Sequence, residues 1–335
     1  MKTLTRAVWG YAILLVLLLL APFLGAYPVF VMKLLCFALF ASAFNLLLGY
    51  TGLLSFGHAA FFGGAAYMAG YSMKFWGVTP ELGLLLGTVV GGLMGWVAGW
   101  LSIRRQGIYF AMITLALAQM VYFICLQAPF TGGEDGLQAV PRGKLFGVLD
   151  LSDDLTMYYV TLVIAAIGFV LIARTVNSPF GQVLRALKDN EPRAVSLGYD
   201  VKRFKLIAFV ISAALTGLAG ALKTLVLGFA TLTDVHWTTS GSVVLMTLLG
   251  GMGSLSGPLV GATIIVSLEN KIGDLGTWLS KVTGFDWFAT LGESVTIVTG
   301  FIFVVCVLSF RRGLMGEVIN RLRSKPQRLA SPAGR

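Results

Sequence analysis

The residues that could do chemistry are few in this chain and lie far apart in the sequence. Two histidines, His58 and His236, are too few for a zinc site. Cys36, Cys125 and Cys306 stand singly in apolar runs, which argues against a disulfide framework or a metal cluster. No G-x-x-x-x-G-K-[ST] phosphate loop occurs. The sequence therefore predicts a protein that is not an enzyme, with no resident cofactor and no metal.

Lys223 is the clearest charge within an apolar stretch. It could line a transport path and hold an anionic group, or its stem could extend to the membrane surface. Proton-coupled transporters usually carry buried acidic residues, whereas Asp234, Glu269 and Glu293 lie near the ends of the predicted spans. A transporter with this sequence takes its energy from another subunit, or the chain is a passive channel.

The composition indicates a membrane protein. Of 335 residues, 57% are hydrophobic and only 12% are charged, about half the charged fraction of soluble domains, which is about 25%. This excludes a soluble enzyme, a disordered chain and a nucleic-acid-binding domain. The 41 glycines suit close helix contacts in lipid. The predicted fold class is all-α, a polytopic transmembrane helical bundle in a lipid bilayer.

Long uncharged apolar runs predict ten membrane spans. The first resembles a secretory signal, but about 20 apolar residues are enough to cross a membrane. The third, eighth and ninth are short or Gly-interrupted, and half-helices or re-entrant segments are alternatives for them. The spans are 7–27, 29–49, 57–73, 82–103, 107–128, 156–174, 204–230, 240–253, 257–270 and 293–310.

The charges of the loops predict the orientation. With both termini in the cytoplasm, 18 basic residues fall inside and 5 outside, as the positive-inside rule requires. The acidic loop 129–155 is then outside, and the basic loop 174–205 is inside. His236 and Trp237 fall at the outer face, where Trp237 would be an interface anchor.

The chain contains an internal repeat around two glycine-rich segments. Leu47–Ser55 matches Leu248–Ser256 without a gap and with six identities in nine positions. Paired Gly-interrupted segments are typical of substrate paths in transporters; chance similarity or plain helix packing is the alternative. The direction of the two copies relative to each other stays open. The predicted path residues are Asn45, Gly49, Gly52, Ser55, Gly57, His58, Gly250, Gly253 and Ser256.

Two of these residues also have simpler interpretations. Asn45 lies near the inner end of the second span, where it can bond to a neighbouring helix instead of substrate. His58 directly follows the first Gly-rich segment and can serve to cap a broken helix.

The inner loop predicts two short helices. Ser178 is suited to cap a helix with Pro179 at its first position. Asn190 or Glu191 can cap a second turn, Gly198 is a natural stop, and Asp200 suits the start of the seventh span. The pair could lie passively at the membrane surface, but its length and punctuation favour docking of a partner. The predicted docking residues are Val183, Arg185, Leu187, Lys188, Glu191, Arg193, Ala194, Val195, Leu197 and Gly198.

The sequence resembles the M-type permease of bacterial ABC importers for branched-chain amino acids over about residues 30–315. The matching stretches are NLLLGYTGLLSFGHAAFFGGAAY (45–67), RRQGIYFAMITLALAQM (104–120), TGGEDGL (131–137), SPFGQVLRALKDNEPRAVSLGYDVKRFKLIAFVISAALTGLAGAL (178–222), WTTSGSVVLMTLLGGMGSLSGPLVGA (237–262) and RRGLMG (311–316).

This resemblance implies a periplasmic binding protein, a second, H-type permease and two cytoplasmic ATPase subunits, one of which meets loop 178–203. ABC permeases carry E-A-A followed by a Gly there; Glu191, Ala194 and Gly198 are present with a different spacing.

The expected function is import of branched-chain or related hydrophobic amino acids by ATP-driven alternating access. A permease for urea, short amides or aromatic acids, or a passive small-solute channel, is the alternative. We expect one permease domain over 1–320, a basic cytoplasmic tail over 321–335, and a multi-pass location in the bacterial inner membrane.

Overall fold

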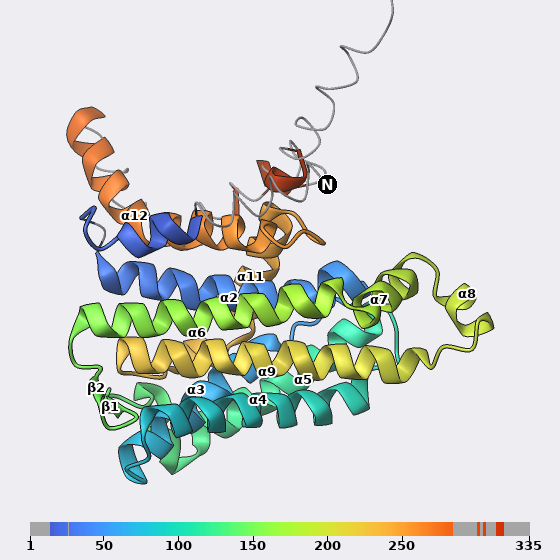
Figure 1. The fold of residues 1–335 in the computed structure, drawn as a ribbon, viewed down its shortest axis with the longest axis horizontal. Helices are drawn as coiled ribbons and strands as arrows, with labels where there is room; N and C mark the ends of the chain where they lie inside the picture. Colours follow the sequence, from blue (N-terminus) through green and yellow to red (C-terminus); the bar gives the residue numbers. More distant parts are fainter. Residues whose placement is uncertain (1–13, 26, 284–299, 302–303, 306–312, 318–335) are drawn as a thin grey trace, which may run out of the picture.

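The computed structural model describes residues 14–25, 27–283, 300–301, 304–305 and 313–317, and within them the fold is helical (Figure 1). Residues 14–20 are also helical. The remaining elements are α2 (Pro28–Thr51), α3 (His58–Phe75), α4 (Pro80–Ser102), α5 (Ile108–Gln127), η1 (Pro129–Thr131), η2 (Gly133–Asp135), β1 (Lys144–Leu145), β2 (Leu149–Asp150), α6 (Asp154–Asn177), α7 (Pro179–Asp189), α8 (Glu191–Ser196), α9 (Val201–Leu227), α10 (Leu232–Val235), α11 (Trp237–Gly250) and α12 (Gly257–Thr283).

The all-α membrane fold class is confirmed. In the described part of the chain, α2, α4, α5, α6 and α9 are long and apolar enough to cross a membrane. The predicted spans 29–49, 82–103, 107–128 and 156–174 agree with α2, α4, α5 and α6 to within a few residues. Predicted span 257–270 is too short, because α12 continues to Thr283. Of predicted span 7–27, residues 7–13 and 26 lie outside the described residues, and so does most of predicted span 293–310.

Small residues bring α4 and α9 into close contact. Gly87, Gly91 and Gly95 recur every four residues of α4 and so share one face. A Cβ atom added to Gly91 would lie 2.8 Å from Cα of Gly217 on α9. The abundant glycines therefore serve helix packing, which in lipid depends on close contact between backbones.

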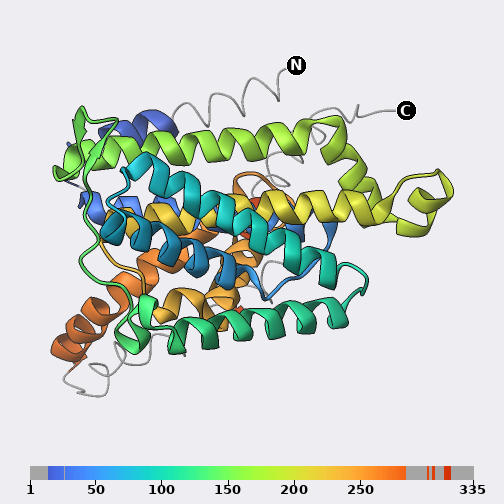
Figure 2. The same ribbon diagram turned by 90° about the horizontal axis from the view of Figure 1, so that it is seen from below.

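The two ends of the bundle carry opposite charge. One end, here called the α8 end, holds α7, α8 and the turn between α4 and α5; the other, the hairpin end, holds the β1–β2 hairpin (Figures 1 and 2). Gln106 of the α4–α5 turn bonds to Glu191 at 2.9 Å, which places both at the α8 end. The basic loop predicted to be inside lies at the α8 end, and the acidic loop predicted to be outside lies at the hairpin end.

After α9, the chain turns back into the bundle. Ala230 pairs with Leu137 at the hairpin end, but Ser240 on the first turn of α11 accepts a hydrogen bond from the Ala59 backbone at 2.8 Å. His58, the residue before Ala59, bonds to Ser212. Ser212 lies roughly 22 Å from the C-terminus of α9, at 1.5 Å per residue. α11 is therefore a half-helix that begins near the middle of the bundle.

His236 and Trp237 stand at the start of α11, one turn before Ser240. His236 contacts Tyr122, five residues before the end of α5 at the hairpin end, so the expected position of these two residues at the outer face stays a prediction. The alternative of a half-helix, left open for the eighth span, is the one that the structure adopts.

Candidate functional site

Two helix breaks carry the repeated glycines, and they meet at the α8 end of the bundle. α2 ends before Gly52, and α11 ends just before Gly253. Both glycines have left-handed backbone conformations, with φ of 75° and 77°, which side chains with a Cβ rarely adopt.

Asn45 joins the two breaks. Its Oδ1 accepts from the Gly253 backbone N–H at 2.9 Å, and its Nδ2 donates to the Ser254 carbonyl at 2.8 Å. Asn45 is 2% exposed, so its amide satisfies backbone groups that the break of α11 leaves without helix partners. The interpretation of Asn45 as a contact between helices is confirmed.

The breaks approach so closely that glycine is required. A Cβ atom on Gly49 would lie 2.6 Å from the Gly253 nitrogen, and one on Gly253 would lie 3.3 Å from the Gly49 carbonyl oxygen. A Cβ atom on Gly250 would overlap the backbone of Gly257. Any larger residue would therefore push the two breaks apart.

His58 is enclosed and fully bonded. Ser212 donates to the Ala43 carbonyl at 2.6 Å, so His58 Nε2 donates to Ser212 at 2.9 Å. Nδ1 then accepts from Ser55 at 3.1 Å, while the Ser55 oxygen accepts from the Gly57 N–H at 3.2 Å. Both ring nitrogens are occupied and the side chain has no exposed surface, so His58 fixes the start of α3 between α2 and α9.

The other predicted path residues lie beside these breaks. Gly57 packs against Thr114 of α5, where a Cβ atom would lie 3.0 Å from the Thr114 carbonyl. Ser256 is half-buried and directly precedes α12. The structure thus brings together most of the predicted path residues, with Asn45 at their centre.

The two predicted helices of the basic loop are present. Ser178 caps α7 with Pro179 next to it, Asn190 caps α8, and Asp200 caps α9, each through a side-chain oxygen that accepts a backbone N–H. Gly198 follows with a left-handed φ of 85°. Local capping signals therefore determined this loop.

The apolar side of this loop mostly faces its own chain. Leu184, Leu187 and Ala194 belong to a buried cluster with α9, and Val183 is half-buried. This contradicts the expected role of Leu187 and Ala194 as docking residues. Val195 and Leu197 are 58% and 69% exposed, so the surface that remains for a partner lies on α8 and just after it.

The charged residues among the predicted docking residues are only partly free. Arg185 lies 5.3 Å from the centre of the Tyr50 ring and donates to the Val176 carbonyl. Glu191 is paired with Lys205 at 2.7 Å. Arg193 is exposed.

Lys188 links the loop to the first helix break. Its Nζ donates to the Gly49 carbonyl at 2.8 Å, and its stem lies 3.3 Å from the position of a Cβ atom on Gly52. α7 is therefore bonded to the same segment that contacts Gly253. No sequence signal indicated this contact, because it joins residues 139 positions apart.

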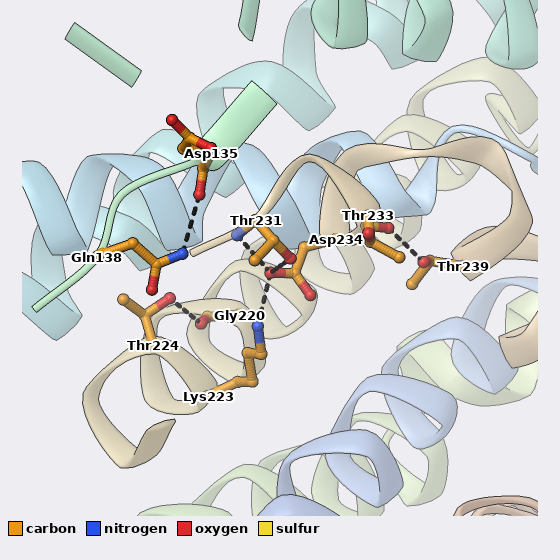
Figure 3. Close-up of polar contacts among 9 residues, drawn as sticks. All are labelled: Asp135, Gln138, Gly220, Lys223, Thr224, Thr231, Thr233, Asp234 and Thr239. Atoms are coloured by element: carbon orange, nitrogen blue, oxygen red, sulfur yellow. Dashed lines mark hydrogen bonds and ion pairs between the residues drawn. The ribbon is translucent and has the colours of Figure 1, made fainter. Parts of the chain in front are cut away.

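Lys223 has a partner that the sequence analysis did not assign. Its Nζ lies 2.6 Å from Asp234 Oδ2, with side chains 5% and 9% exposed (Figure 3). The same oxygen accepts from the backbone and the hydroxyl of Thr231. The spacing of Thr231 and Asp234 is that of a capping box, which was the available signal that Asp234 starts a helical turn.

Comparison with known proteins identifies the family. Residues 29–310 match the family of branched-chain amino acid transport system permease components. The chain belongs to this family. It is a multi-pass membrane protein of the ABC transporter permease type.

Curated relatives of the family are named for different substrates. The high-affinity branched-chain amino acid transport system permease protein LivM of Escherichia coli K12 is 28% identical over 268 residues, 72% of this chain and 62% of the relative. The ribose import permease protein RbsC of Bacillus subtilis 168 is 33% identical over 214 residues, 60% of this chain and 62% of the relative. The chain thus spans less than two thirds of the length of these relatives. No solved structure matches the chain.

Proposed function

We propose that this chain is one of two permease subunits of an ABC importer that moves branched-chain or related hydrophobic amino acids into the cell. The family match and the LivM relatives support the substrate class. The observation that carries a coupled transporter over a passive channel is the bond between α7 and the first helix break through Lys188 and Gly49.

The proposed assembly contains a second, H-type permease, two cytoplasmic ATPase subunits and a periplasmic binding protein. ATP hydrolysis belongs to the ATPase subunits. In this assembly the chain lies in the bacterial inner membrane with the α8 end and both termini in the cytoplasm, as the charges of its two ends suggest. Residues 1–320 form the permease domain, and 321–335 form a basic tail.

The ATPase would dock on α8. The exposed side chains of Val195, Leu197 and Tyr199 supply an apolar centre, and the exposed Arg193 supplies a polar rim. Central apolar anchors carry most of the energy of an interface, whereas rim charges contribute little. The buried cluster of α7, α8 and α9 would make this docking surface move as one body with α7.

Movement of α7 would reach the transport path by two hydrogen-bonded steps. Lys188 holds the Gly49 carbonyl, and Asn45, one helical turn earlier on α2, holds the backbone at Gly253 and Ser254. A displacement of the docking surface would therefore shift both breaks together. Alternating access would follow from opening and closing the bundle at these breaks.

The direct test is uptake by the whole importer in proteoliposomes. The chain is purified with its permease partner and ATPase subunits, and uptake of radioactive leucine is measured with binding protein outside and ATP inside. We expect uptake that needs ATP and that unlabelled isoleucine and valine compete for. Uptake without ATP would indicate a channel, and competition by ribose or urea but not by valine would assign another substrate.

A matched pair of lysine variants tests the coupling. Lys188→Met keeps the stem on Gly52 but removes the donor to Gly49, whereas Lys202→Met removes an exposed charge at the same end. We expect Lys188→Met to keep ATP hydrolysis but to lower leucine uptake per ATP several-fold, and Lys202→Met to act like the wild type. Equal coupling in both variants would refute the role of Lys188.

A further inference from the structure

One side of α11 is only partly covered by the described part of the chain. Thr238 is exposed and Gly241, Ser242, Leu245 and Leu248 are half-buried. These positions recur at helical spacing along one side of α11. The opposite side, including Val243, Met246, Thr247 and Gly250, is buried.

Gly241 marks the most open point of this face. A Cβ atom added there would meet no atom of the described residues within 4 Å. The glycines that pack helices in this chain are the opposite case, since a Cβ atom on Gly91 or Gly217 would lie within about 3 Å of the facing backbone. Gly241 therefore leaves space next to α11 rather than a contact.

Polar groups surround the start of this face. Thr233 and Thr238 are exposed and His236 is half-buried. His236 uses Nδ1 to bond Thr238, and no described residue bonds its Nε2. The ring also contacts Tyr122 of α5, with centroids 5.2 Å apart.

The position of Ser240 bears on what lies next to this face. The Ser240 bond to Ala59 places the start of α11 at the level of the middle of α9. Irregular backbone and exposed polar side chains are tolerated at this depth only inside protein or beside a water-filled cavity. The exposed faces of α4 and α6 are apolar, as expected for faces that contact lipid. They expose Val89, Leu93, Ile167 and Val170.

We propose that the face of α11 from Thr238 to Leu245, with His236 at its outer end, lines the water-filled path of the substrate through the membrane. His236 and Thr238 offer neutral donors and acceptors for the charged ends of a zwitterionic amino acid, and Leu245 offers an apolar surface for its side chain. This substrate class rests on the proposed function above. The path then leads from mid-membrane toward the two helix breaks.

The Lys223–Asp234 pair positions this path. It fixes α10 to α9 immediately before His236, and the side chain of Val235 fills the space over Gly63 of α3, where any Cβ atom would collide with it. The buried pair thus fixes the position of α10 and of the start of α11. Lys223 and Asp234 are positioning residues that need not touch the substrate.

The test is the reactivity of single cysteines in the complete importer in membrane vesicles. Cys36, Cys125 and Cys306 are first replaced by Ala. Gly241→Cys and Thr238→Cys report on the face, while Val89→Cys and Ile167→Cys, at similar depth on exposed apolar surfaces, are the controls. The probe is a charged, water-soluble methanethiosulfonate reagent, which reacts with a thiolate and so requires water at the site.

We expect the two α11 cysteines to react at least tenfold faster than both controls, and substrate-loaded binding protein with ATP to change their rate. Reaction rates equal to those of the controls would overturn the proposal, because the face would then be covered by lipid or by another helix. Labelling needs no leucine. If the α11 cysteines label rapidly but the importer does not transport leucine, the substrate assignment is overturned and the water-filled path is still supported.

Discussion

Removing one partner of the buried Lys223–Asp234 pair should be among the most costly single substitutions in the chain. Asp234 Oδ2 receives the Lys223 ammonium at 2.6 Å and the N–H and hydroxyl of Thr231 at 3.0 and 3.1 Å (Figure 3). The Lys223 and Asp234 side chains are 5% and 9% exposed. Asp234→Ala would leave a lysine without its counter-charge in an apolar site.

The expected losses follow from these contacts. Breaking a buried pair by removing one partner costs about 3–5 kcal/mol, and losing the cap at Thr231 adds about 1 kcal/mol. Asp234→Ala should therefore lower the free energy of unfolding by about 4–6 kcal/mol. Lys223→Met should cost less, about 3 kcal/mol, because Asp234 keeps both bonds from Thr231. The double variant should be at least about 1 kcal/mol less destabilised than the sum of the two single variants.

The assay is reversible unfolding in detergent micelles, followed by far-ultraviolet circular dichroism as sodium dodecyl sulfate is added. Asp154→Ala is the matched control, since the pair of Asp154 with Arg142 is 52% and 23% exposed and such pairs contribute about 0–1 kcal/mol. Additive single variants, or an Asp234→Ala variant as stable as Asp154→Ala, would refute the structural role of the pair.

Three further predictions concern the breaks, the packing glycines and an exposed cap. Asn45→Ala should cost about 1–3 kcal/mol, because it leaves the Gly253 N–H and the Ser254 carbonyl without their side-chain partner, and it should lower leucine uptake more than expression; normal uptake would remove it from the coupling route. Gly220→Ala, whose new Cβ would overlap the Phe62 backbone, should lower the thermal midpoint by several degrees. Gly241→Ala, whose new Cβ meets no atom of the described part of the chain, should leave it unchanged. The backbone N–H and the hydroxyl of Thr156 bond the Asp153 carboxylate and hold its pKa below the usual value. The cap therefore stabilises the folded protein above the ordinary Asp pKa, and this contribution is lost as the pH falls through the lowered pKa. The loss of stability at acid pH should be smaller in Asp153→Asn than in the wild type.

Features that depend on local sequence could be predicted. The cap residues Ser178, Asn190 and Asp200 act within three positions of the N–H groups that they accept, so the sequence alone contains both partners. The breaks at Gly52 and Gly253 are likewise local, because only a residue without a Cβ readily adopts their backbone conformation. The positions of the spans could also be predicted, because the length of an apolar run is a local property of the sequence.

Features that depend on depth and on distant partners could not be predicted. The position of a polar, Trp-containing segment such as 231–240 does not follow from its composition, because its contacts are with Gly63 and Ala59, far away in the sequence. Leu187 has the same amphipathic spacing whether its apolar face meets α9 or another subunit. The packing of α7 on α9 decides that question, and no helical pattern contains it.

The lone polar residues of the apolar stretches have a common physical cause in this chain. Within a bilayer, each interruption of a helix exposes backbone groups that water cannot satisfy. Asn45 satisfies the break after α11, Ser240 the first turn of α3, and Asp234 the first turn of α10. Two of these three residues lie far in the sequence from the break that they serve. An isolated polar residue in an apolar run therefore predicts that a helix break exists nearby in space, and only the folded structure shows which break it is.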